Sequence, residues 1–287
     1  MTADAPAPIS ALEWQADAFT DAFGRTPFPF THRLSGRPEL TVDAMATLAA
    51  RVPPSWTRPH TGRLPVVFPQ KVTTLDASAP DVARGIADNG QRLLVYHLER
   101  LSSYADVVGS CYDAATGVVG NREGGVCAQS VSILVASPGA VVQSHFDRHH
   151  NLLLQLEGTK EITVGTFADP VEGHRVLERA RRWTHNNLSD LPPQTHTFEL
   201  GPGDGLYIPP YAFHWVHGGP DASVALSYGF ATPSTLRAPL VYWCNAHLRR
   251  LGLRPRPPGQ SDRGDRVKAA VMTHSAQVRD RLRRVTR

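Results

Sequence analysis

The chain has 287 residues, of which 41% are apolar and 20% charged, with a net charge of +4 and 3 cysteines. This length allows one large domain or two ordinary ones and buries a sizeable core without disulfides. The cysteines are odd in number and form no CxxC pair, which excludes a disulfide framework and favours a reducing compartment. No secretory signal and no stretch of about 18 apolar residues is evident. We therefore expect a soluble, cytoplasmic protein without a membrane partner.

The charge is unevenly distributed along the chain. Residues 249–287 hold 12 Lys and Arg against 3 Asp, a net of +9, whereas residues 1–248 hold 18 basic against 23 acidic side chains, a net of −5. The basic character therefore belongs to the C-terminal tail. It is not interleaved with aromatic stacking residues, and no RRM, KH or zinc-finger pattern accompanies it. We expect no nucleic-acid partner.

The first 125 residues are expected to mix helices and strands. Ser10 and Glu13 have the spacing of a capping box, which predicts a helix over residues 10–23. A second helix, a strand and a third helix are predicted at residues 41–51, 93–96 and 99–115. Residues 1–125 are therefore interpreted as an α/β elaboration that packs on the segment after it.

From residue 126 onward, short β-rich segments alternate with turn residues. Eight strands are predicted, at residues 131–136, 141–146, 152–156, 161–166, 195–200, 206–209, 213–217 and 223–230. Their succession favours a closed or sandwiched antiparallel unit over βαβ alternation. Residues 126–235 are therefore expected to form a jelly-roll core, which makes the protein mainly β with flanking helices.

Two regions lie outside this β pattern. The connection at residues 168–193 is rich in arginine, and it is either a functional border of the site or a solvated face. Residues 236–287 form a basic segment in which helices are predicted at 238–251 and 265–285. The second of these helices carries a narrow apolar stripe, which has to pack on the core or on another copy of the chain: Val267, Val271, Val278 and Leu282.

The strongest chemical signal is the tripeptide His145-Phe146-Asp147. Residues two apart on a strand face the same side, so the imidazole and the carboxylate point into one cavity. One His and one Asp are two members of a facial triad, which leaves coordination positions open and suits Fe(II). Alone the tripeptide is a weak signal, because it arises by chance in many proteins.

The surroundings of the tripeptide resemble the two-part cupin pattern. Asn151 and two flanking glycines keep the spacing of its first part, and residues 203–214 keep the spacing of its second. Asp147 and Asn151 replace a histidine and a glutamate of that pattern. Tyr211 and Gly218 stand where glycine and asparagine are usual. These departures argue against an ordinary small cupin with three histidines and a glutamate.

Two longer segments, His145–Lys160 and Pro202–His214, are similar to the JmjC-type, cupin-like hydroxylases, which include the asparaginyl hydroxylase of a hypoxia-inducible factor. The resemblance is specific over residues 126–232 and looser on either side. It implies a double-stranded β-helix, Fe(II), O₂ and 2-oxoglutarate as cosubstrate. Similar enzymes pair subunits through C-terminal helices, which suggests a homodimer.

The resemblance also implies roles for individual residues. The implied iron ligands are His145, Asp147 and His214, the last selected over His217 by its spacing from Pro209. The residues that it places near 2-oxoglutarate are Lys160, which would pair with the distal carboxylate, Tyr96, Asn151 and Ser227. Without the motif, Lys160 would be a hairpin surface charge and Tyr96 a half-buried strand tyrosine. Ser227 and Val142 differ from the corresponding residues of the hypoxia-factor enzyme, so the individual hydrogen bonds to the cosubstrate stay open.

These observations predict an Fe(II)- and 2-oxoglutarate-dependent oxygenase that hydroxylates an unactivated C–H bond. The substrate is either a peptide or protein side chain, which we favour, or a small biosynthetic intermediate. Hydroxylation and demethylation are not distinguished. The alternative from another class is a metal-binding cupin that does not use 2-oxoglutarate: an isomerase, a cosubstrate-free dioxygenase or a ligand sensor. Such a protein would have no use for Lys160.

Overall fold

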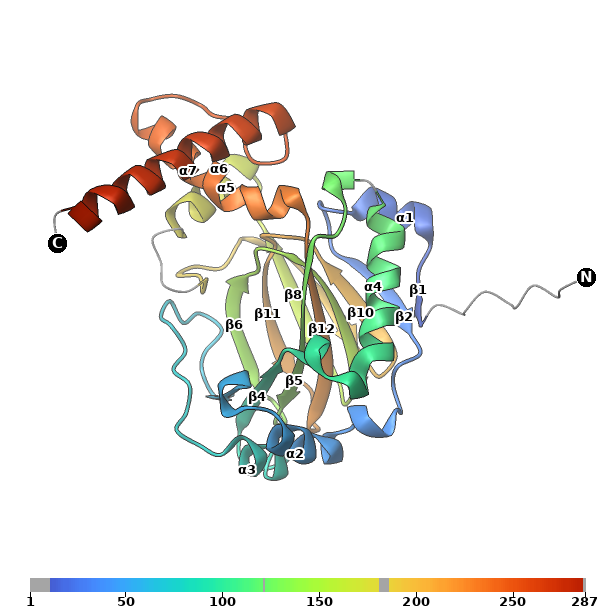
Figure 1. The fold of residues 1–287 in the computed structure, drawn as a ribbon. Helices are drawn as coiled ribbons and strands as arrows, with labels where there is room; N and C mark the ends of the chain where they lie inside the picture. Colours follow the sequence, from blue (N-terminus) through green and yellow to red (C-terminus); the bar gives the residue numbers. More distant parts are fainter. Residues whose placement is uncertain (1–10, 121, 181–185, 286–287) are drawn as a thin grey trace, which may run out of the picture.

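The computed structural model describes residues 11–120, 122–180 and 186–285. In them an eight-stranded and a four-stranded sheet pack against each other, with helices around them (Figure 1). The strands are β1 (Leu12–Glu13), β2 (Phe28–His32), β3 (Thr57–Thr61), β4 (Gln91–Tyr96), β5 (Ala128–Ala136), β6 (Val141–Phe146), β7 (His150–Glu157), β8 (Lys160–Thr166), β9 (Gln194–Leu200), β10 (Asp204–Ile208), β11 (Phe213–Gly218) and β12 (Ser223–Ala231). The α-helices are α1 (Ala16–Ala22), α2 (Val42–Arg51), α3 (Ala79–Arg84), α4 (Ala105–Val119), α5 (Pro170–Ala180), α6 (Pro233–Arg250) and α7 (Asp262–Val285).

The predicted jelly roll is confirmed. The larger sheet has the order β1-β2-β10-β7-β12-β5-β4-β3, and the smaller sheet has the order β6-β11-β8-β9. All of these neighbours pair antiparallel. The eight strands expected after residue 126 are β5 to β12, with small differences at their ends. They are divided between the two sheets, as a double-stranded β-helix requires.

Strands from the N-terminal segment extend the larger sheet on both sides. β2 pairs with β10, and β4 pairs with β5. The segment before residue 125 is thus continuous with the barrel through backbone hydrogen bonds, in addition to packing on it. Our division of the chain at residues 125 and 235 stays a proposal.

The larger sheet is covered on both faces. In β7, Leu152 and Leu154 pack in the main apolar cluster with side chains of α1, α2 and α4, whereas Leu153 belongs to a second cluster that joins the two sheets. This explains why β7 is almost continuously apolar, because a strand buried on both sides needs no polar alternation. The side chains that join the two sheets at this point are therefore apolar.

Two helix predictions for the N-terminal segment were wrong at their starts. The helix expected over residues 10–23 begins at Ala16, because Leu12–Glu13 pairs with β2 as a short strand; Ser10 lies outside the described residues. The helix expected from Glu99 begins at Ala105, after two short 3₁₀ turns. Glu99 instead accepts a hydrogen bond from the backbone N–H of Val131, so its side chain ties this segment to β5.

The C-terminal helices are confirmed with earlier starts. α6 begins at Pro233, because Thr232 caps it in a capping box. In α7, Val267 and Val271 are exposed, while Ala269 and Met272 are buried. The expected apolar stripe thus does not pack on the core at Val267 and Val271, and the side chains of Val278 and Leu282 lie outside the described part of the chain.

The connection at residues 168–193 contains α5, and its residues 181–185 lie outside the described residues. Across the described ranges, no helix is both long enough and apolar enough to cross a bilayer.

A substitution at Leu154 tests the packing of the apolar core. Its side chain is 0% exposed at the centre of β7, so Leu154→Ala should lower the free energy of unfolding by about 3 kcal/mol. Urea denaturation followed by circular dichroism measures this. Val267→Ala, at a position that is 58% exposed, is the control and should change stability by less than about 0.5 kcal/mol. Equal losses in the two variants would contradict the packing described.

Candidate functional site

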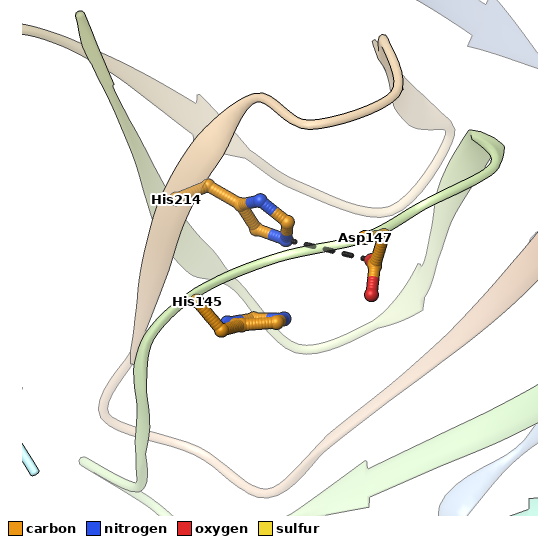
Figure 2. A group of neighbouring side chains, drawn as sticks. All are labelled: His145, Asp147 and His214. Carbon is orange, nitrogen blue, oxygen red and sulfur yellow. Dashed lines mark ion pairs between the residues drawn. The ribbon is translucent and has the colours of Figure 1, made fainter. Parts of the chain in front are cut away.

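Three side chains converge where β6 and β11 run side by side (Figure 2). His145 lies in β6, Asp147 follows the last residue of that strand, and His214 lies in β11 directly opposite His145. One ligand atom of each residue lies within 4.8 Å of the others. Among the described residues, this is the one cluster of at least three His, Cys, Asp or Glu side chains with that proximity.

The backbone orients both imidazoles. Nδ1 of His145 donates to the carbonyl of Gln143 at 2.7 Å, and Nδ1 of His214 donates to the carbonyl of Ala212 at 2.9 Å. A carbonyl only accepts, so each Nδ1 is the donor, and Nε2 is the ring nitrogen left to bind a ligand. Hydrogen bonds of this kind are typical of histidines that ligate a metal.

The cluster is buried on one side and open on the other. His214 is 4% exposed. Its burial, and secondarily the neighbouring His145, lowers its pKa to about 4, against the opposing effect of Asp147. His214 is therefore neutral at pH 7, as a ligating imidazole must be. The side chain of Asp147 is 40% exposed, and its Oδ2 lies 3.8 Å from Nε2 of His214.

A cavity of about 270 Å³ extends from this cluster between the two sheets, and His145 and Asp147 line it. The four residues expected around 2-oxoglutarate line it too: Tyr96, Asn151, Lys160 and Ser227. They come from β4, β7, β8 and β12. The Ser227 hydroxyl donates to Oδ1 of Asn151 at 2.9 Å. The structure thus brings together all seven residues that the sequence had singled out.

Strand register gives this cavity two ends. At the metal-ligand end, one row of partners across β4, β5 and β12 is Tyr96, Ser132 and Ser227. Four residues further along these strands, about 13 Å away, the corresponding row is Arg92, Ala136 and Ser223. We call this second region the far end of the cavity.

Lys160 belongs to the far end. It opens β8 opposite Gly218, which lies four residues beyond His214 in β11. The hairpin that precedes it touches the second row, since a Cβ at Gly158 would lie 2.9 Å from Cβ of Ser223. The metal-ligand cluster and Lys160 therefore approach the cavity from opposite ends.

Lys160 is a buried cation without a partner among the described residues. Its side chain forms no hydrogen bond or ion pair there, and the residue is 7% exposed. Burial lowers the pKa of its ammonium group to about 8. A buried charge is costly unless an opposite charge or hydrogen-bonding groups compensate it. Lys160 is thus placed to receive an anionic ligand.

Two residues of the cavity were missed in the sequence. Arg92 is 7% exposed and donates only to neutral oxygens, Oε1 of Gln143 at 3.1 Å and the carbonyl of Thr61 at 3.4 Å. Ser223 is 1% exposed, and its hydroxyl has no hydrogen-bond partner among the described residues. Strand alternation from Tyr96 could have identified Arg92, because residues four apart share a face. No signal in the sequence pointed to Ser223.

The turn before His214 is hydrogen-bonded to the backbone of Asp147. Tyr211 has φ of 64°, a left-handed conformation that is uncommon for a bulky residue and that explains the usual glycine of cupins at this position. The backbone N–H of Tyr211 donates to the carbonyl of Asp147 at 2.6 Å. Its ring lies 5.9 Å from that of Phe146 and 5.0 Å from that of Tyr242. Side-chain packing therefore holds the strained turn against the metal-ligand segment.

Two further histidines that lie near the cluster in the sequence, His217 and His150, have other surroundings. His217 pairs with Val141 beyond an irregularity in the β6–β11 register and lies outside the cluster. His150 is fully buried, stacked between the rings of Phe23 and Phe230, and its Nδ1 lies 2.7 Å from the hydroxyl of Tyr207. It is a core histidine.

Residues 123–237 match the family model of the JmjC domain. This stretch contains all eight barrel strands and the three converging side chains. The chain carries a JmjC domain. The resemblance that the two motif segments suggested is thereby confirmed. No curated protein matches the sequence.

The JmjC domain and its flanking segments together resemble solved structures of YcfD from Escherichia coli. One matches with a TM-score of 0.55 and 17% identity, over 92% of this chain and 68% of that chain. A second, described as the ribosomal oxygenase YcfD, has a TM-score of 0.51 and 17% identity over 92% and 67%. A third, in complex with cobalt and 2-oxoglutarate, has a TM-score of 0.51 and 18% identity over the same shares. The shared fold thus extends beyond the JmjC domain.

The pKa of Lys160 predicts a pH dependence of stability. Below about pH 8 the ammonium is charged in both the folded and the unfolded chain, so its burial costs its full free energy; above pH 10.5 the amine is neutral in both. The free energy of unfolding therefore rises as the pH increases from about 8 to 10.5, by at most about 3 kcal/mol from this residue. The titratable groups that share its cavity are Arg92, Tyr96, His145 and Asp147.

The comparison with Lys160→Met isolates this effect from other titrations. We expect the variant to unfold at higher urea concentration than the wild type near pH 7.5, and this advantage to shrink toward pH 10. A difference that does not change with pH would contradict the buried, unpaired ammonium.

Proposed function

We propose that this protein is a non-haem Fe(II)- and 2-oxoglutarate-dependent oxygenase that hydroxylates an unactivated C–H bond. The observation that carries the proposal is the pairing of a His145–Asp147–His214 cluster at one end of a cavity with the unpaired, buried Lys160 at the other. The JmjC domain supports it. The likeness to YcfD, whose structure holds cobalt and 2-oxoglutarate, agrees with it.

The donor set fits a divalent iron ion. Two imidazoles and one carboxylate offer one ligand atom each within 4.8 Å of one another, and this donor set would hold such an ion. A metal held by these three side chains alone would have room for the 2-oxo acid and O₂ as well. When bound, iron would supply the redox chemistry by which O₂ and 2-oxoglutarate become succinate, CO₂ and the oxygen atom of the hydroxylated product.

The residues of the chain bind and orient the reactants. Lys160 holds the distal carboxylate of 2-oxoglutarate by a charge-assisted hydrogen bond. The Tyr96 hydroxyl donates a hydrogen bond to the same carboxylate. Burial raises the pKa of this hydroxyl, which keeps it protonated. The hydrogen-bonded pair of Ser227 and Asn151 lines the cavity, with Ser227 in the register row of Tyr96 at the metal-ligand end. The apolar interior between the sheets excludes water from the reacting groups.

The substrate is a peptide or protein side chain in this proposal. It reaches the metal from the exposed side of Asp147. The connection at residues 168–193 borders this entrance, since Asn187 forms a β-bridge with His145 and its side chain donates to the carbonyl of Gln70. The description of YcfD as a ribosomal oxygenase supports a protein substrate.

The proposal includes a cytoplasmic location, which the three unpaired cysteines support. It also includes a homodimer that forms through α6 and α7. The exposed Val267 and Val271 of α7 supply apolar surface for a second copy.

Variants of the ligands test the function. His145→Ala and Asp147→Ala should each reduce Fe(II)-dependent formation of succinate from 2-oxoglutarate by at least about 100-fold, because each removes a metal ligand. Co(II) titration calorimetry should show a matching loss of metal affinity. His217→Ala, a nearby histidine outside the cluster, is the control and should retain both.

Retained activity in both ligand variants would refute the assignment. A wild-type protein that binds the metal but not 2-oxoglutarate would instead identify the other class, a metal-binding cupin without this cosubstrate.

A further inference from the structure

A second hollow of the molecule lies outside the barrel, between α5 and the C-terminal end of α6. Its volume is about 660 Å³, and the two helices that form it lie together at one end of the barrel (Figure 1). We call it the arginine groove. Five arginines line it, against one acid, Glu178. The arginines are Arg175, Arg179, Arg249, Arg250 and Arg254.

The acid of the arginine groove already has a partner. Nε of Arg249 donates to both carboxylate oxygens of Glu178, at 3.0 and 2.8 Å, and the Glu178 side chain is 5% exposed. This buried pair ties α5 to α6 and is not available to a ligand. The other four arginines are exposed, and within the described part of the chain they form no hydrogen bond or ion pair. The arginine groove thus carries four uncompensated positive charges.

Helix ends alone do not explain these four arginines. Basic side chains are favoured in the last turn of a helix, because the helix dipole leaves partial negative charge there. This accounts for Arg179 and Arg250, which lie in the last turns of α5 and α6. It does not account for Arg175, which precedes the last turn of α5, or for Arg254, which lies beyond α6.

The turn after α6 is closed by the backbone. The N–H of Leu253 donates to the carbonyl of Leu248 at 3.1 Å. The N–H of Gly252 donates to the carbonyl of Arg249 at 3.0 Å, and Gly252 has φ of 79°. These bonds and the left-handed glycine form a Schellman motif, which reverses the chain and satisfies the final carbonyls. The arginines are therefore not needed to cap the helix, and their N–H donors stay available.

The arginine groove adjoins the support of the metal-ligand segment. In α5, Leu177 packs in one apolar cluster with Phe146 of β6. The next residue, Glu178, lines the groove. One side of α5 thus supports the strand that carries a metal ligand, while another side forms a wall of the groove. α5 also belongs to the connection at residues 168–193, which borders the entrance to the site.

The chemistry of the arginine groove favours an acidic polypeptide as its occupant. A guanidinium binds a carboxylate through two parallel N–H donors. The indole that lines the groove, Trp243, is 8% exposed and offers little surface on which a nucleic-acid base could stack. Leu253 is 55% exposed and offers an apolar contact to a peptide side chain. A second copy docked groove to groove would set like charges against each other.

We propose that the arginine groove docks an acidic segment of the peptide or protein substrate, separate along its chain from the residue that is hydroxylated. The inference rests on the proposed function and deepens it, because it names the substrate class: a polypeptide with a segment rich in Asp or Glu. The carboxylates of that segment accept charge-assisted hydrogen bonds from the four exposed arginines. The arginine-rich connection then has a binding role and is more than a solvated face.

The experiment measures binding of fluorescein-labelled peptides to the full-length protein by fluorescence anisotropy at low salt. The probes are an octapeptide of alternating Glu and Ala and its neutral counterpart of alternating Gln and Ala. We expect the wild type to bind the Glu peptide at least about 10-fold more tightly than the Gln peptide. The double variant Arg175→Gln/Arg179→Gln should weaken binding of the Glu peptide about 10-fold and change that of the Gln peptide little. Arg254→Gln should weaken binding of the Glu peptide a few-fold.

The double variant Arg51→Gln/Arg84→Gln is the matched control. It removes the same charge from exposed positions of α2 and α3, at the opposite end of the barrel from α5 and α6 (Figure 1). Its affinity for the Glu peptide should equal that of the wild type. Equal losses in the two double variants would show attraction by net charge alone and would overturn the inference. If Arg175→Gln/Arg179→Gln does not fold, Arg254→Gln decides, and wild-type affinity in that variant would overturn it equally.

Two further measurements separate the remaining outcomes. A labelled octamer of uridine that binds more tightly than the Glu peptide, and loses affinity in Arg175→Gln/Arg179→Gln, would make the groove a nucleic-acid site and overturn the inference. Calorimetry of the Co(II)-loaded wild type with 2-oxoglutarate runs in parallel. Absence of 2-oxoglutarate binding would refute the proposed function and, with it, the substrate role of the groove. Binding of 2-oxoglutarate without preference for the Glu peptide would refute the docking site alone.

Discussion

The pairing of β6 with β11 is the constraint on which the site depends. Because His214 stands directly opposite His145, the two imidazoles share one face of the smaller sheet. A slip of one residue in this ladder would turn one of them to the other face. The other edge of β11 is fixed as well, since β11 pairs with β8 along its whole length. The backbone thus sets the positions of the ligands, and carbonyl hydrogen bonds set their rotation.

The second determinant is the contrast between the two ends of the cavity. Apolar side chains from both sheets surround it, so a charge placed there interacts more strongly with a ligand than it would in water. At one end two imidazoles and a carboxylate offer ligand atoms; at the other, the buried ammonium of Lys160 offers hydrogen-bond donors. A molecule that spans the cavity must therefore be a chelator at one end and an anion at the other. This requirement of shape and charge restricts the cosubstrate more than any single residue does.

Local signals in the sequence were sufficient for the barrel and for placing His145 beside Asp147, whereas His214 was assigned through the family resemblance. Turn residues and apolar runs delimit β5 to β12, and two-residue spacing places His145 and Asp147 on one side. Features that depend on long-range pairing were not accessible in this way. Ser223 reaches the cavity only because β12 pairs with β5, and Arg92 follows from strand alternation only once Tyr96 and the pairing of β4 with β5 are known. The start of α1 was mispredicted for the same reason, since Leu12 pairs with His32 in β2. Tyr96 and Lys160 required the family resemblance, because their residue types alone allow ordinary surface or strand roles.

The continuation of the larger sheet into the N-terminal segment also defines the smallest unit that can stand alone. A fragment cut to the matched stretch, residues 123–237, keeps β5 and β10 but loses their neighbours β4 and β2. The backbone N–H and C=O groups along both strands would then face solvent as open edges, which recruit strands from other molecules. The N-terminal strands therefore cover both edges of the barrel sheet, and one of them, β4, also carries Tyr96 into the cavity, so the same segment closes an edge and completes the site.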